Sequence, residues 1–195
     1  MHHAPRDSGW IEVICGPMFS GKTEELIRRL KRAQFARQRV QIFKPKLDSR
    51  YAPDRVVSHS SLSLESTVVE RADEILLHVR KDTEVVGIDE IQFLGGDAVR
   101  VVETLANAGC RVVVAGLDQD YTGKPFEPLP SLLAIAEYIT KQLAICVVCG
   151  DPAGRSQRLV ADAELVRVGA VGEYEARCRK CHSPRPVEQL SLPVE

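Results

Sequence analysis

The sequence lacks a long apolar run, an excess of charge of either sign and many aromatic residues. No apolar stretch approaches the roughly 20 residues that a membrane-spanning helix needs. The formal net charge is −1, from 26 basic and 27 acidic side chains, so nothing indicates a nucleic-acid-binding or membrane-surface patch. Residues 1–9 lack the apolar core of a signal peptide, and we expect them to form a disordered tail. These absences favour a globular protein of the cytoplasm.

Alternating strand-like and helix-like segments predict an α/β fold. Strands are expected at residues 10–15, 40–43, 84–89, 111–115 and 142–146, and helices at 21–37, 72–79, 96–108 and 132–139. Because the strands are almost continuously apolar, they predict a parallel sheet with helices on both faces. A polar stretch at 46–66 has no clear periodicity, and we expect a functional or mobile loop there.

The composition changes after residue 145, which suggests three parts. Residues 1–9 form the expected tail and residues 10–145 the α/β domain. Residues 146–195 hold four of the six cysteines, short strand-like pieces and many charges, and end in a second tail. We therefore expect a small zinc-binding module to follow the main domain.

Residues 16–23 read Gly-Pro-Met-Phe-Ser-Gly-Lys-Thr and match the P-loop pattern G-x-x-x-x-G-K-[ST]. They follow a predicted strand and open a predicted helix, which is the context that the pattern requires. Backbone N–H groups of such a loop point at phosphate oxygens, and the helix N-terminus adds positive potential. Lys22 is then expected to bind the β- and γ-phosphates of a nucleotide, and Thr23 to bind Mg²⁺. A glycine-rich turn that fits the pattern by chance is the alternative, but few such turns have both flanking elements.

Residues 85–90 are an apolar strand-like run that ends in two acidic residues. An Asp at such a strand end in P-loop proteins holds Mg²⁺, often through water, which predicts this role for Asp89. Strand alternation predicts that the Glu90 side chain turns the other way, toward the phosphoryl acceptor. A carboxylate there can accept a proton from an attacking hydroxyl, so Glu90 is a candidate general base. The alternative is that Glu90 is an acid favoured by the dipole of a following helix.

The cysteines predict a structural zinc site. Two Cys-x-x-Cys pairs, Cys146 with Cys149 and Cys178 with Cys181, are separated by 28 residues. Four thiolates are the tetrahedral ligand set of a closed zinc site, which leaves no position for a catalytic water. A pair of redox dithiols is the alternative, and the doubling of the pattern argues against it. His182 could replace one ligand, although four thiolates already satisfy the metal.

Cys15 and Cys110 lie in or beside apolar strand-like runs. We expect each to be a small buried hydrophobic residue without a reactive role.

In chain order, these motifs and several shorter ones resemble the zinc-containing, single-P-loop type of the thymidine kinase family. The agreement covers roughly residues 11–182. The shorter motifs are Asp48-Ser49-Arg50-Tyr51, Ser58-His59, Asp89-Glu90-Ile91-Gln92-Phe93, Gly116-Leu117-Asp118, Lys124-Pro125-Phe126, and Tyr174 before the second cysteine pair.

The resemblance implies a kinase that transfers the γ-phosphate of ATP to the 5′-hydroxyl of thymidine, giving dTMP and ADP. It implies that Glu90 is the base, that Arg50 neutralises phosphate charge and that Asp48 assists Mg²⁺ or nucleotide positioning. The implied ATP and Mg²⁺ site comprises Gly16, Pro17, Met18, Phe19, Ser20, Gly21, Lys22, Thr23, Asp48, Ser49, Arg50, Asp89 and Gln92. The implied thymidine site comprises Met18, Phe93, Leu117, Tyr121, Ser156, Leu165, Val166, Arg167, Val168, Gly169 and Tyr174.

The resemblance also implies features beyond these residues. Residues 165–169 would pass over the thymine base as a lasso loop and read its edge with main-chain groups, and Arg158 would stabilise that loop. Structural Zn²⁺, a homotetramer and feedback inhibition by dTTP are implied as well. The apolar residues Phe93, Leu117 and Tyr121 have a simpler reading as core, because core is the commoner fate of apolar residues near strand ends.

Three other functions remain open, and a fourth, a nucleotide-binding switch without turnover, is made unnecessary by Glu90. The chain could be a P-loop ATPase or another nucleoside kinase. It could also be a zinc-ribbon ATPase that binds nucleic acid, but residues 150–177 hold four arginines, five acids and Tyr174 as the sole aromatic. Such a module should instead show clustered basic residues with stacking aromatics.

Overall fold

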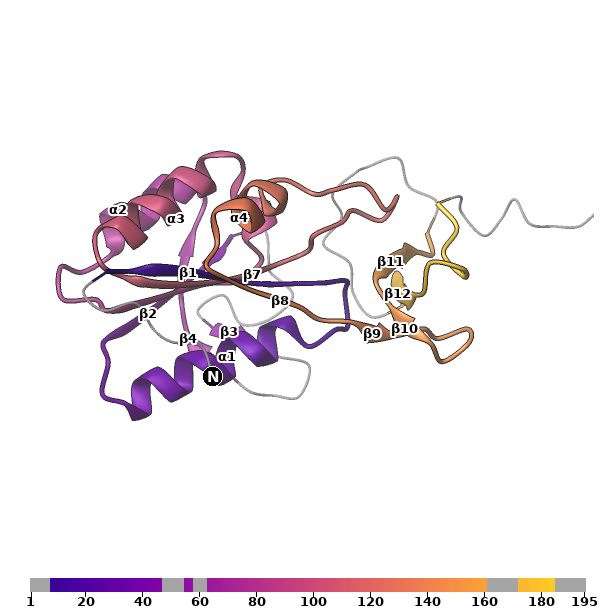
Figure 1. The fold of residues 1–195 in the computed structure, drawn as a ribbon, viewed down its shortest axis with the longest axis horizontal. Coiled ribbons are helices and arrows are strands. Elements are labelled where there is room, and N and C mark those ends of the chain that lie inside the picture. The colour runs from indigo at the N-terminus through magenta and orange to yellow at the C-terminus, as the bar shows by residue number, and fades with distance from the viewer. Residues whose placement is uncertain (1–7, 47–54, 58–62, 161–171, 185–195) are drawn as a thin grey trace, which may run out of the picture.

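The protein is described by a computed structural model that covers residues 8–46, 55–57, 63–160 and 172–184 (Figure 1). The main sheet has six strands in the order β5-β2-β6-β7-β1-β8. All neighbouring strands in it are parallel. Its strands are β1 (Trp10–Cys15), β2 (Val40–Pro45), β5 (Thr67–Val69), β6 (Val85–Ile88), β7 (Arg111–Gly116) and β8 (Tyr138–Lys141). The predicted parallel sheet is therefore confirmed.

Helices cover both faces of this sheet. They are α1 (Lys22–Phe35), α2 (Ala72–His78), α3 (Asp97–Asn107) and α4 (Leu129–Ile135), with a short 3₁₀ helix η1 at Ile91–Leu94. Figure 1 shows α1 on one side of the sheet and α2, α3 and α4 on the other. This arrangement confirms the expected α/β architecture.

The two faces of the sheet explain the continuous apolar runs. In β7, Val112 and Val114 pack in the cluster that includes α3 and α4, whereas Val113 and Ala115 pack under α1. Successive side chains of a strand point to opposite faces, so a strand with helices on both sides must be apolar at every position.

A smaller unit follows β8 at one end of the sheet (Figure 1). It contains two antiparallel pairs: β9 (Ala144–Ile145) with β10 (Pro152–Ala153), and β11 (Arg155–Arg158) with β12 (Tyr174–Arg177). Its buried apolar cluster consists of three alanines and two cysteines: Ala144, Ala153, Ala176, Cys146 and Cys178. A core this small contributes little stability, so a unit of this kind needs a further staple such as a metal.

Three predictions about elements were wrong in part. The helix expected at 132–139 is α4, which starts at Leu129 and ends at Ile135, and the residues from Tyr138 form β8 on the edge of the sheet. The strand expected at 142–146 is the two-residue β9, which pairs with β10 outside the main sheet. The stretch at 46–66 is not entirely loop, because β3 (Arg55–Val57) pairs with β4 (Ser63–Glu65).

Candidate active site

The candidate active site lies where parallel strands end at the same edge of the sheet. The P-loop follows β1, Asp89 and Glu90 follow β6, and Leu117 follows β7. These three strands are held in register, with Ile88 level with Val114 and Cys15 level with Gly116. In open α/β sheets, ligands bind in the crevice outside the carboxyl ends of the strands.

The P-loop is a tight turn that accepts no side chain at its first residue. Gly16 has φ +144°, and a Cβ atom there would lie 2.2 Å from the main-chain oxygen of Gln142. Phe19 has φ 63°, a strained value for a non-glycine residue. Lys22 begins α1, is largely buried, and its Nζ donates a hydrogen bond of 2.7 Å to the Pro17 carbonyl oxygen. The loop therefore folds around its own lysine, which places that charge among the backbone groups of the cradle.

Asp89 and Thr23 bring two oxygen atoms together beside the P-loop. Asp89 is buried, and its Oδ2 accepts a hydrogen bond of 3.1 Å from the Thr23 hydroxyl. Its Oδ1 accepts a hydrogen bond of 3.0 Å from the Glu90 N–H. A carboxylate and a hydroxyl are hard oxygen ligands of the kind that Mg²⁺ prefers, so this pair fits the ion.

The Glu90 side chain does not follow strand alternation, so that part of the prediction was wrong. Strand β6 ends at Ile88, and Glu90 has φ 49° and ψ 41° at the start of η1. Glu90 lies directly before η1, where the alternative of an acid favoured by the helix dipole would also place it, and its side chain makes no cap hydrogen bond to that helix. Instead Glu90 Oε2 accepts a hydrogen bond of 2.5 Å from Gln92 Nε2. The direction of the carboxylate is thus set by a turn and by a neighbouring amide.

Side chains of the small unit contact the P-loop and the β7 end. The Ser156 hydroxyl accepts a hydrogen bond of 3.0 Å from the Met18 N–H. The Arg158 guanidinium carbon lies 3.9 Å from the centre of the Tyr121 ring. Arg158 also donates hydrogen bonds of 3.0 and 2.7 Å to the Tyr174 hydroxyl. Three residues predicted for the thymidine site, Met18, Tyr121 and Ser156, therefore lie in contacts that join the two parts of the chain, and Tyr174 is linked to them through Arg158.

The remaining predicted residues fall into two groups. Phe93 lies edge-to-face with Phe126 at 6.3 Å, and Leu117 donates its N–H to Gln92. The other group lies outside the described residues: Asp48, Ser49, Arg50, Tyr51, Ser58, His59, Leu165, Val166, Arg167, Val168 and Gly169.

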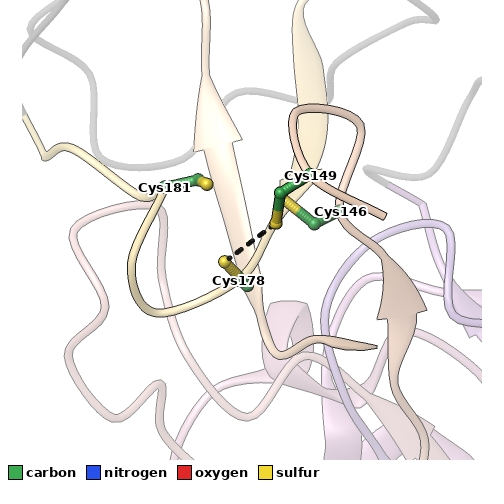
Figure 2. A group of neighbouring side chains, drawn as sticks. All are labelled: Cys146, Cys149, Cys178 and Cys181. Atoms are coloured by element: carbon green, nitrogen blue, oxygen red, sulfur yellow. Dashed lines mark hydrogen bonds between the residues drawn. The ribbon is translucent and has the colours of Figure 1, made fainter. Parts of the chain in front are cut away.

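The four predicted zinc ligands meet in the small unit (Figure 2). Their Sγ atoms all lie within 4.8 Å of one another, and those of Cys149 and Cys178 are 3.6 Å apart. A tetrahedral zinc ion with bonds of about 2.3 Å separates its sulfur ligands by about 3.8 Å, whereas a disulfide holds them about 2.05 Å apart. All four cysteines are free, so the geometry fits zinc and excludes paired disulfides.

His182 is directed away from this cluster. Its Nε2 lies 2.9 Å from the Tyr121 carbonyl oxygen, and burial lowers the pKa of its ring. The group of residues that could hold a metal contains the four cysteines without His182. The ring therefore links the zinc unit to the segment after β7.

The two remaining cysteines are buried, as predicted. Burial raises the pKa of the Cys15 thiol to about 11, and the nearby Asp118 carboxylate adds to this effect. A thiol with such a pKa is almost entirely protonated at neutral pH and is a poor nucleophile.

An ion pair and a backbone contact behind the P-loop were not predicted from the sequence. Asp118, buried after β7, lies 2.6 Å from Lys141 Nζ at the end of β8. Gln142 donates its N–H to the Cys15 carbonyl oxygen over 2.8 Å. Asp118 belongs to a motif quoted above, but no local spacing pairs it with Lys141 or pairs Gln142 with Cys15. The members of each contact are far apart in sequence, and part of β8 was expected to be helical.

Comparison with known proteins decides among the functions that the site allows. The family model described as thymidine kinase matches residues 9–182. The chain belongs to the thymidine kinase family. A curated thymidine kinase of Rhodothermus sp. (strain ITI 518) is 58% identical over 185 residues, which cover 94% of this chain and 86% of that relative. Membership of the thymidine kinase family makes the chain a phosphotransferase. It therefore argues against the alternative of a zinc-ribbon ATPase that binds nucleic acid. Among the described residues of this family member, no helix is long and apolar enough to cross a membrane.

Proposed function

We propose that this chain transfers the γ-phosphate of ATP to the 5′-hydroxyl of thymidine, with Glu90 as the general base. The observation that supports it most directly is the meeting of three groups at one edge of the sheet: the P-loop, the Thr23–Asp89 pair and the Glu90 carboxylate. They supply a phosphate cradle, hard oxygen ligands and a proton acceptor, which phosphoryl transfer to a hydroxyl requires.

In the proposed reaction, the 5′-oxygen of thymidine forms a bond to the γ-phosphorus as the bond from that phosphorus to the β–γ bridging oxygen breaks. ADP leaves with the electron pair of the broken bond, and the proton of the 5′-hydroxyl passes to Glu90. Lys22 supplies positive charge to the β- and γ-phosphates, where negative charge is redistributed in the transition state. Thr23 and Asp89 would hold Mg²⁺, which neutralises phosphate charge when bound.

The thymidine site is proposed to lie between the P-loop and the small unit. Met18, Tyr121, Ser156 and Tyr174 are supported by the contacts that bring them to this boundary. Phe93 and Leu117 remain proposals that rest on the resemblance. The same holds for Asp48, Arg50 and the lasso at 165–169.

Four thiolates would hold one structural Zn²⁺ in the small unit, whose alanine-rich core supports the need for it. The chain is proposed to work in the cytoplasm, where free cysteines and zinc thiolates persist. A homotetramer and inhibition by dTTP are proposed from the family resemblance.

The test is an ADP-release assay with ATP, Mg²⁺ and a panel of thymidine, deoxyuridine, deoxycytidine, deoxyadenosine and deoxyguanosine. Thymidine should give the highest kcat/KM, and mass spectrometry should identify dTMP as the product. ADP release that is equal without any nucleoside would instead indicate an ATPase. A higher kcat/KM with a purine nucleoside or with deoxycytidine would indicate another nucleoside kinase.

A further inference from the structure

The side chain of Gln92 joins the ends of two neighbouring strands inside the site. Gln92 lies in η1 and is only 5% exposed. Its Nε2 donates to Glu90 Oε2 over 2.5 Å, and its Oε1 accepts from the Leu117 N–H over 3.1 Å. One amide therefore links the turn after β6 to the first residue after β7.

The orientation of this amide is fixed by chemistry. A backbone N–H can only donate, so the Leu117 N–H must face the amide oxygen of Gln92. The NH₂ group then has to face Glu90, whose ionised carboxylate can only accept. A flipped amide would place two donors together and two acceptors together. The amide oxygen therefore faces Leu117 and the NH₂ group faces Glu90.

The backbone around the amide oxygen is closely packed. Leu117 directly follows β7, which pairs with β1 on one side and β6 on the other. A Cβ atom at Gly116 would lie 2.7 Å from Gln92 Oε1 and 3.0 Å from Ile91 Cγ2. The sheet thus brings its backbone against the glutamine, and the glutamine is anchored to an interior strand that is paired on both sides.

Glu90 lies at a turn, and the hydrogen bond from Gln92 contributes to the direction of its carboxylate. Its φ of 49° lies in the left-handed region, and the residue is only half-buried. A general base must come within about 2.6–3.2 Å of the proton that it accepts. Misplacement by about 1 Å can cost about 10²-fold in rate.

We propose that Gln92 is a positioning residue that holds the Glu90 carboxylate for proton transfer, and that it does not contact ATP or Mg²⁺ itself. This inference rests on the proposed function, in which Glu90 is the base. It reassigns Gln92, which the family resemblance placed in the nucleotide site. Gln92 acts on the reaction only through Glu90.

The test is a double-mutant cycle with Gln92→Met and Glu90→Gln. Methionine has a similar length but offers no amide. We expect Gln92→Met to lower kcat by roughly 10–100-fold, with the Kd for ATP-Mg and for thymidine, measured by calorimetry, changed by less than about threefold. In the Glu90→Gln background, the same change should lower kcat by less than about threefold, because the residue through which Gln92 acts is already inactive as a base.

A matched control is Gln41→Met in β2. Gln41 also anchors backbone groups: it donates to the His78 carbonyl oxygen and accepts from the Arg80 N–H. It lies near the start of β2, away from the end of the sheet that holds the site. Gln41→Met should lower the unfolding midpoint without changing kcat by more than about threefold. Should Gln92→Met fail to fold, Gln92→Asn keeps the buried amide but is one carbon too short to reach both partners, and the same cycle applies.

The outcomes separate the two hypotheses. Three results with Gln92→Met would overturn the positioning role. They are a full kcat, a large loss of nucleotide affinity, and a loss of kcat that multiplies fully with that of Glu90→Gln in the double mutant. Full kcat in Glu90→Gln overturns the base assignment instead, whatever Gln92→Met does.

Discussion

Replacing Glu90 by glutamine tests the chemical step while leaving the site in place. The amide oxygen of the replacement can still accept the hydrogen bond that Gln92 Nε2 now gives to Glu90 Oε2 over 2.5 Å. The contact between Thr23 and Asp89 and the contact between Lys22 and Pro17 do not involve the Glu90 side chain. The change therefore removes a charge and a proton acceptor while these contacts stay in place.

The expected loss follows from that chemistry. Removal of a general base typically lowers the rate by about 10²–10⁴-fold, which corresponds to about 2.7–5.4 kcal/mol of activation free energy. The Kd values for ATP-Mg and thymidine should change by less than about threefold, because the phosphate cradle and the nucleoside contacts are unaltered.

The assay is steady-state ADP release at saturating ATP and thymidine, with calorimetry for both ligands and a thermal unfolding curve for each protein. A variant that is folded, binds both ligands normally and turns over near the wild-type rate would refute the assignment of Glu90. The next candidate would then be Asp48, which lies outside the described residues.

Three further predictions concern the rest of the molecule. Lys22→Ala should lower kcat by at least about 10²-fold through loss of transition-state charge stabilisation, and wild-type turnover would rule out this P-loop as the catalytic phosphate site. Metal analysis should find one zinc per chain. Cys149→Ser or a strong chelator should lower the unfolding temperature, because structural zinc contributes to folding free energy. Protein that is purified without chelator and contains no zinc would contradict the site. Glu12 is buried between two arginines, with its carboxylate oxygens 2.8 Å from Arg29 Nη1 and 2.7 Å from Arg111 Nε. Burial raises the pKa of Glu12, but hydrogen bonds and charges, chiefly those of Arg111, outweigh burial and hold that pKa below 4.5. The ionised form of Glu12 is thus favoured by folding, so its stabilising effect should be present above pH 4.5 and lost as pH falls through the lower folded pKa. Glu12→Gln should lower the free energy of unfolding by about 3 kcal/mol at pH 7 in urea titrations. A variant whose stability depends on pH below pH 5 in the same way as the wild type would contradict this.

The failed element predictions show where local pattern stops being informative. The helix expected at 132–139 extended past the observed end of α4. The chain instead leaves α4 after Ile135 and adds β8 to the edge of the sheet beside β1. Pairing with a distant strand outweighs a weak local preference of this kind. The same limit explains Glu90, because a short 3₁₀ helix after β6 cannot be seen in strand alternation.

The sequence by itself determined the parts of the protein whose chemistry lies in short, ordered spacing. The P-loop, the acidic end of β6 and the two Cys-x-x-Cys pairs are local patterns, and the parallel sheet follows from continuous apolar strands between helices. Tertiary structure decided which distant side chains meet. Ser156 bonds to Met18 across 138 positions of the chain. Gln92 bonds to Leu117 because β6 and β7 end side by side. Such contacts leave no signal in spacing, because sheet order and loop paths set them, and these depend on packing of the whole chain.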